Sequence, residues 1–175
     1  MSYEILSSKS IFHGKVFDVR IDRVKIPGNR EANFVIVSHA GAVTILPLDK
    51  ENNILFIRQY RHAAGEEILE LPAGVIDKHE HQEESAIREL REETGMTANN
   101  IFPLGEFYLA PGYSTEYMYV YFAHDLSPDP LPQDEDEQII VEKIPVDEAY
   151  RMASQGEIRD AKTLAVLQLA HSHLE

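Results

Sequence analysis

The feature that most limits the possible folds of this chain is the segment Gly74–Met96, which joins a loop to a run of strong helix formers. The run at residues 83–94 stops at Gly95, a residue favoured just after a helix end. At ~100° per residue, its apolar side chains form one stripe: Ala86, Ile87, Leu90 and Thr94. Three glutamates lie within ~100° of one another on a different face: Glu89, Glu92 and Glu93. We therefore expect a helix that packs on a core by one side and projects three carboxylates from another.

Two interpretations of this acidic face are compatible with its spacing. A solvated face costs little, because repulsion between exposed like charges three or four residues apart is only ~0.2–0.5 kcal/mol per pair. A hard cation such as Mg²⁺ binds carboxylate and carbonyl oxygens, and a loop that opens at Gly74 can bring backbone close to such an ion. Glu80 can supply a further carboxylate from that loop, and Arg88 can orient a carboxylate through paired hydrogen bonds. The spacing alone leaves both interpretations open.

The charge balance and the absence of cysteine narrow the classes of partner and site. The 175 residues include 16 Lys and Arg against 30 Asp and Glu, a formal net charge of −14. So acidic a chain repels nucleic acid and anionic membranes, so we expect neither as a partner, and a phosphate compound would need a bridging cation. No cysteine is present, which excludes disulfides, thiolate metal sites and Cys nucleophiles. With no signal-peptide pattern and no apolar run of ~20 residues, we expect a cytoplasmic protein.

The order of the expected elements predicts an α/β fold. Strands are expected at residues 15–24, 33–38, 42–48, 54–60, 102–109, 116–123 and 139–144. Helices are expected at residues 83–94, at 146–155 and after Asp160, which can cap the last of them. Strands mixed with a few helices favour a layered sandwich. Residues 1–40 form a small antiparallel β ribbon that cannot bury its own face, so it must pack on the main domain, residues 41–175, or on a second subunit.

The acidic segment also resembles a known family. Its pattern is Gly74, five residues, Glu80, seven residues, and then Arg-Glu-Leu-Arg-Glu-Glu-Thr-Gly-Met from Arg88 to Met96. This is the Nudix box, with every specified position filled. The resemblance implies an α/β/α sandwich with a mixed sheet and hydrolysis of a nucleoside diphosphate linked to another moiety. It also implies a divalent metal, Mg²⁺ with Mn²⁺ as a substitute, held by Glu89, Glu92, Glu93 and the carbonyl of Ala73.

Further similarities point to the ADP-ribose pyrophosphatase branch of that family, which hydrolyses nucleoside diphosphate sugars. Glu70-Leu-Pro-Ala-Gly74 matches the branch's lead-in to the box, and Pro111 lies sixteen residues after Gly95. By this resemblance Arg61 contacts phosphate, and Gly112 and Glu116 belong to the loop that holds a terminal ribose. The full set of expected substrate-binding residues is Arg20, Arg61, Glu70, Gly112 and Glu116. Arg20 enters this set because it lies on the polar face of the ribbon, which is expected to form a homodimer and complete the nucleotide pocket.

A general base is expected in the acidic run at residues 134–137. In similar enzymes a glutamate from the corresponding loop acts as the base, so Glu137 is the first candidate and Glu135 the second. A solvated charge run without a catalytic role is the alternative interpretation.

Two other functions stay open. One is a housecleaning hydrolase of nucleoside triphosphates, including the deoxy compounds, or of dinucleoside polyphosphates; Pro111 and the Glu70–Gly74 segment favour the nucleotide-sugar substrate instead. The other is a nucleotide sensor without turnover. The complete set of box glutamates argues against a sensor, because binding alone gains nothing from a full metal cluster.

Overall fold

The computed structural model describes residues 3–133 and 138–174, which divide into two compact units. The first unit combines the chain up to Gly41 with Phe107–Met118. The second contains Ala42–Glu106 and the chain from Tyr119 onward. The boundary between a ribbon at residues 1–40 and a main domain at residues 41–175 stays a prediction.

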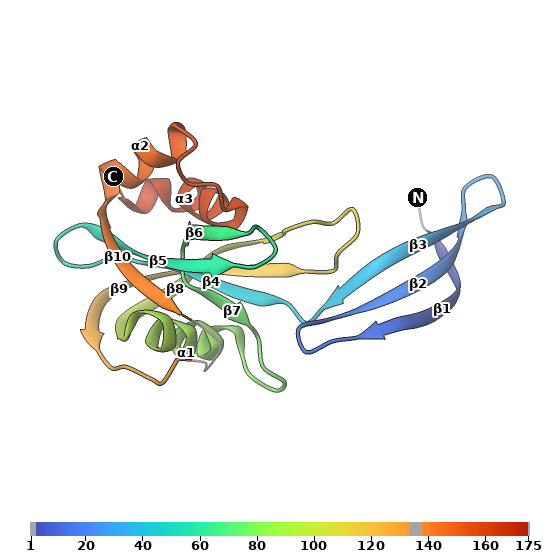
Figure 1. The fold of residues 1–175 in the computed structure, drawn as a ribbon, viewed down its shortest axis with the longest axis horizontal. Helices are drawn as coiled ribbons and strands as arrows, with labels where there is room; N and C mark the ends of the chain where they lie inside the picture. The colour runs from blue at the N-terminus through green and yellow to red at the C-terminus, as the bar shows by residue number, and fades with distance from the viewer. Residues whose placement is uncertain (1–2, 134–137, 175) are drawn as a thin grey trace. The chain divides into compact units, whose positions relative to one another are not determined.

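The first unit is built on an antiparallel sheet in the order β1-β2-β3, drawn in blue in Figure 1. Its strands are β1 (Glu4–His13), β2 (Phe17–Ile26) and β3 (Arg30–His39). The tight β2–β3 turn needs left-handed backbone at Gly28 (φ 85°) and Asn29 (φ 59°), two residue types that tolerate it. The loop at residues 110–115 joins this unit because Val37 N–H donates to the Tyr113 carbonyl at 2.8 Å and Thr115 N–H to the Val37 carbonyl at 2.9 Å.

The second unit is a three-layer sandwich (Figure 1). Two sheets, in the orders β10-β5-β6 and β7-β4-β9-β8, lie between α1 on one side and α2 and α3 on the other. The strands are β4 (Ala42–Pro47), β5 (Asn53–Arg61), β6 (Glu66–Glu70), β7 (Ala73–Val75), β8 (Met96–Tyr108), β9 (Tyr117–Pro128) and β10 (Ile139–Pro145). The helices are α1 (Gln82–Thr94), α2 (Val146–Ser154) and α3 (Ala161–Leu174). The predicted α/β sandwich and its N-terminal antiparallel β subdomain are confirmed.

Helix α1 packs against the hydrophobic core of the second unit. Ala86 and Leu90 are fully buried in one cluster of side chains from α1, β4, β5 and β9, completed by Val43, Ile45, Leu55, Tyr121, Ala123 and Leu126. Gly95 ends the helix in the left-handed conformation (φ 71°), and its N–H donates to the Arg91 carbonyl at 3.1 Å. Of the predicted apolar stripe, Ala86 and Leu90 are in this core, whereas Ile87 and Thr94 are only half-buried. In the part of the chain that the structure describes, no helix is long and apolar enough to cross a membrane.

Three strands were not expected from the sequence: β1, β6 and β7. None of the three has the clear alternation of apolar and polar residues that predicts a strand. All ten residues of β1 are exposed, and β7 has only three residues. They form because a neighbouring strand supplies the hydrogen-bond partners, as Ile57 and Arg61 of β5 do where they pair with Glu70 and Glu66 of β6.

Candidate functional site

The acidic face of α1 lies against the backbone of β7 rather than in open solvent. Glu93 is only 2% exposed and Glu89 8%, whereas Glu92 is half-buried. The carboxylate of Glu93 accepts a hydrogen bond from the backbone N–H of Ala73 at 2.8 Å. The expectation that all three carboxylates project away from the packed side of the helix is therefore wrong for Glu89 and Glu93. They share the packed side because α1 contacts both β4 and β7.

Arg88 holds the carboxylates of this face together. One guanidinium nitrogen, Nη1, donates to Glu89 at 2.7 Å and to Glu92 at 2.9 Å. Nε and Nη2 both reach Glu80 at 3.1 Å, and Nη2 also reaches the Val75 carbonyl at 3.2 Å. The Arg88 hydrogen bonds lower the pKa of Glu80. Desolvation disfavours the charged form of Arg88, but its bonds to the glutamates outweigh that cost and raise its pKa. Arg88 and Glu80 are therefore both ionised at neutral pH.

Gly74 leaves room for the Glu89 side chain where the backbone of β7 passes it. A Cβ atom at this position would lie 1.9 Å from Glu89 Oε1 and 2.0 Å from its Cδ. Real Cβ atoms do not approach other heavy atoms so closely, so any side chain here would push the Glu89 carboxylate aside. Glycine thus lets the buried Glu89 carboxylate lie close to the backbone of β7. The sequence indicated only that backbone near Gly74 could approach a bound ion.

These groups suit a hard divalent cation by their chemistry. Carboxylate and backbone carbonyl oxygens are the ligands that such ions take. Glu89 and Glu93 of α1 lie against the backbone of β7, which carries no side chain at Gly74. Within residues 3–133 and 138–174, no three His, Asp or Glu side chains already stand in a metal-ligating arrangement. The guanidinium of Arg88 contacts Glu80, Glu89 and Glu92, and one positive charge shared among three carboxylates leaves an excess of negative charge.

Arg61, the last residue of β5, and Glu70, the last residue of β6, form an ion pair through their side chains. The guanidinium of Arg61 donates two parallel bonds to the Glu70 carboxylate, from Nε at 2.7 Å and from Nη2 at 2.8 Å. Glu70 is 2% exposed and also accepts a bond from the ammonium of Lys162. Burial alone would raise the pKa of Glu70, but the hydrogen bonds and charges of Arg61 and Lys162 outweigh it and lower the pKa. Lys162 was not among the expected site residues; the sequence placed it only in the segment Asp160-Ala161-Lys162-Thr163, which resembles the start of the last helix in the same branch of the family.

The remaining expected substrate contacts belong to the first unit. Arg20 and Asp22 share one face of β2, as expected, and the Arg20 Nε lies 3.0 Å from an Asp22 carboxylate oxygen. Arg20 also donates to the Ser38 hydroxyl. Gly112 is exposed, with open space where a Cβ would stand, and Glu116 is half-buried. The two candidates for the base, Glu135 and Glu137, lie outside the described residues.

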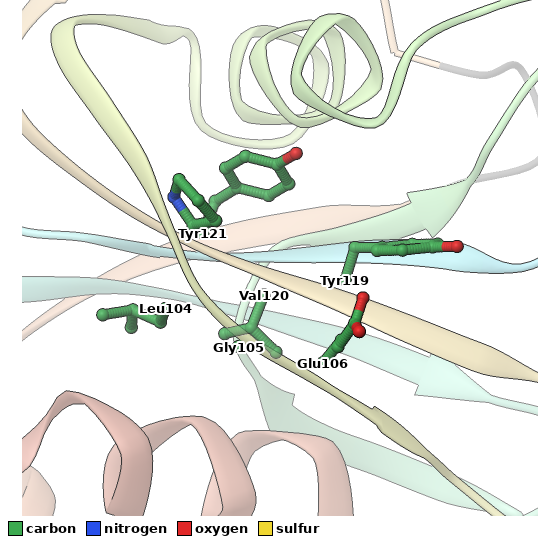
Figure 2. Close-up of a pocket in the computed structure, with 7 residues that line it drawn as sticks. Leu104, Gly105, Glu106, Tyr119, Val120 and Tyr121 are labelled. Atoms are coloured by element: carbon green, nitrogen blue, oxygen red, sulfur yellow. The ribbon is translucent and has the colours of Figure 1, made fainter.

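A hollow of about 360 Å³ lies along β8 and β9 in the second unit (Figure 2). Its lining residues are Pro103, Leu104, Gly105, Glu106, Tyr119, Val120 and Tyr121. The Tyr121 ring points toward α1, and burial raises the pKa of its hydroxyl. Of the expected site residues that the structure describes, none lines this hollow, so those residues do not lie in the cavity seen here.

Comparison with known proteins identifies a family and several named relatives of this chain. The family model described as the NUDIX domain matches residues 38–167. An ADP-ribose pyrophosphatase of Bacillus subtilis (strain 168) is 35% identical over 165 residues, covering 93% of this chain and 89% of the relative. A GDP-mannose pyrophosphatase of Yersinia pestis (strain Pestoides F) is 34% identical over 182 residues, covering 96% of this chain and 89% of the relative.

The fold has a close counterpart among solved structures. The crystal structure of an ADP compounds hydrolase matches 99% of this chain and 95% of its own, with a TM-score of 0.88 and 24% sequence identity. The family model spans the sandwich together with the Gly74–Met96 segment, and the relatives extend over nearly the whole chain. The chain therefore belongs to the NUDIX family.

Proposed function

We propose that this protein hydrolyses the pyrophosphate bond of ADP-ribose or a related nucleoside diphosphate sugar, releasing a nucleoside monophosphate and a sugar phosphate. The observation that carries the proposal is the near full-length relationship to a B. subtilis protein named for this activity. The site supports it, because the carboxylates of α1 can bind the cation that an acidic protein needs before it can bind a diphosphate.

Enzymes of this family generally use a divalent metal, and we assign Mg²⁺, with Mn²⁺ as a substitute, to Glu89, Glu92, Glu93 and the Ala73 carbonyl. When bound, such an ion neutralises phosphate oxygens and lowers the pKa of a coordinated water. Arg88 keeps Glu89 and Glu92 close together, and the Ala73 N–H fixes the Glu93 carboxylate. These contacts hold the acidic side chains in place before any ligand arrives.

Arg61 is proposed to bind the diphosphate, since Glu70 fixes its guanidinium plane through two hydrogen bonds. Arg20, Gly112 and Glu116 are proposed to contact the ribose and base. The homodimer through residues 1–40 is supported by the exposed apolar side chains of β1, including Ile5, Ile11 and Phe12. A cytoplasmic location, and the lack of nucleic acid or membrane partners, stay predictions from the cysteine-free, acidic composition.

The substrate is tested by measuring kcat/KM with Mg²⁺ for ADP-ribose, GDP-mannose, ATP and a dinucleoside tetraphosphate. We expect the highest value for ADP-ribose, with AMP and ribose phosphate as products. GDP-mannose is the second candidate, favoured by the Y. pestis relative. Preference for ATP or the dinucleoside compound would replace the proposal with a housecleaning hydrolase. Magnesium-dependent binding without hydrolysis of any of them would establish a sensor.

Glu137→Gln tests the proposed base. Because a general base contributes about 10²–10⁴-fold, we expect kcat to fall by at least about 100-fold while KM changes little. Glu135→Gln provides the comparison, since it removes a neighbouring charge from the same acidic run and is expected to have a mild effect. If both variants keep kcat within a few-fold of the wild type, neither glutamate is the base.

A further inference from the structure

Lys162 occupies a position that its helix by itself does not favour. It is the second residue of α3 (Ala161–Leu174) and is only 8% exposed. A positive charge in the first turn opposes the helix dipole, and lysine is rarely buried unless it is paired. The first turn of α3 carries no acidic residue of its own. A buried lysine is therefore kept here by contacts outside the helix.

Those contacts are two carboxylates. The ammonium of Lys162 donates to Glu70 of β6, which is 92 residues away in sequence, and to Asp160 at 2.9 Å. Figure 1 shows β6 beside α3. Asp160 caps the helix, because its carboxylate accepts from the Thr163 N–H at 3.0 Å and the Thr163 hydroxyl at 2.6 Å. That hydroxyl in turn accepts a bond from the Leu71 N–H at 2.9 Å, so the start of α3 is tied to the segment that leads into Ala73.

Arg61, Glu70, Lys162 and Asp160 thus form one hydrogen-bonded network of two cations and two carboxylates. Arg61 is its most accessible member, with a side chain 38% exposed, while the Glu70 and Lys162 side chains are 3% and 10% exposed. Without Lys162, the buried carboxylate of Glu70 would keep only Arg61 as a cationic partner, and the network would carry a net charge of −1. Arg61 would then be more fully neutralised and less able to attract an anion.

We infer that Lys162 is a positioning residue for substrate binding: by pairing with Glu70 it keeps the Arg61 guanidinium fixed in orientation and available to the diphosphate of the substrate. This inference rests on the proposed function, in which Arg61 binds phosphate. Lys162 itself touches no substrate. Its role is to supply the second positive charge that the buried Glu70 requires. The charge of Arg61 is then not fully neutralised by Glu70 and can attract the phosphate.

The test is a steady-state comparison of the wild type, Lys162→Met, Glu70→Gln and the double variant, with Mg²⁺ and ADP-ribose. For Lys162→Met we expect KM to rise about tenfold, which is the effect of weakening the contact between Arg61 and the phosphate by about one charged hydrogen bond. We expect kcat to change by less than about threefold. Lys162→Arg keeps the charge and is expected to restore KM to near the wild-type value. If Lys162→Met does not fold, Lys162→Gln, which keeps a donor without the charge, takes its place with the same expectation.

The double variant distinguishes action through Glu70 from a general loss of structure. If Lys162 acts through Glu70, the effects are not additive, and the double variant has a KM no higher than the worse single variant. Lys143→Met is the matched control, because Lys143 also pairs with a carboxylate, Asp49 at 2.9 Å, and is expected to leave KM unchanged.

Three outcomes would overturn the inference. These are an unchanged KM in Lys162→Met, a failure of Lys162→Arg to restore KM, and additive effects in the double variant. Each of them leaves the proposed function standing. If the wild-type protein itself hydrolyses none of the nucleoside diphosphate sugars, the proposed function is wrong and the inference falls with it.

Discussion

Glu93→Gln is expected to lower kcat/KM for the pyrophosphate substrate by at least about 100-fold. Loss of a group that only supports a metal ligand costs about 10–100-fold, and Glu93 is proposed as a ligand itself, so 100-fold is the lower bound. Glutamine keeps the shape of the side chain and an oxygen that can accept the Ala73 N–H, so the 2.8 Å contact and the fold are expected to persist. The charge is lost, and with it the attraction for a divalent cation. The measurement is kcat/KM across a range of Mg²⁺ concentrations, together with the Mg²⁺ affinity from calorimetry.

Glu83→Gln is the matched control for this prediction. Glu83 lies on the same helix, is exposed, and its replacement removes the same charge. We expect its kcat/KM and its Mg²⁺ affinity to stay near the wild-type values. If Glu93→Gln were as active as Glu83→Gln, Glu93 would be a buried structural carboxylate and the metal site would have to be sought elsewhere.

Gly74→Ala is expected to be nearly as damaging, for a steric reason. The added methyl group would stand 1.9 Å from Glu89 Oε1, so the carboxylate must move, although Arg88 Nη1 holds it at 2.7 Å. Displacement of a reactive or ligating group by about 1 Å can cost on the order of 100-fold in rate. Overpacking of this kind costs about 1–3 kcal/mol in stability, which is too little to unfold a typical domain. We therefore expect a folded protein with greatly reduced kcat/KM.

Thermal unfolding and kinetics together check the Gly74 prediction. Gly105→Ala provides the comparison, because its added Cβ would lie 3.4 Å from Leu169 Cδ1, an ordinary contact distance. This second variant should unfold and react much as the wild type does. Unchanged activity in Gly74→Ala would mean that the Glu89 carboxylate can move without consequence, which would remove Glu89 from the proposed metal ligands.

Helix α1 shows which features of the structure can be predicted from the spacing of residues along the chain. Helix-forming residues, the apolar pair Ala86 and Leu90, and Gly95 predicted both its position and its buried stripe, because these signals act within one or two turns. The contact of Arg88 with Glu92 also follows from local spacing, since residues four apart on a helix are neighbours, whereas its contact with the adjacent Glu89 does not follow from that rule. The relation of Glu93 to Ala73, 20 residues earlier, was not indicated by spacing, because it depends on where α1 packs.

Strand β6 and the contact of Lys162 with Glu70 could not be predicted from the spacing of residues along the chain. The five residues of β6 alternate poorly, and the strand exists because β5 offers a partner edge. Lys162 looked like part of a helix start, and its contact with Glu70 joins segments 92 residues apart. Spacing along the chain cannot predict a contact between residues 92 positions apart, because the two segments meet only when the entire unit has packed.

The amino-acid sequence by itself determined the α/β class, the helix with its three glutamates and the family to which they point, because each follows from short-range spacing along the chain. Only the tertiary structure decided that Glu89 and Glu93 are buried, that a side chain at Gly74 would displace the Glu89 carboxylate, and that Arg61, Glu70 and Lys162 meet. The physical reason is that the environment of a charge depends on which distant segments exclude water from it, and that exclusion arises only when the layers of the sandwich pack together.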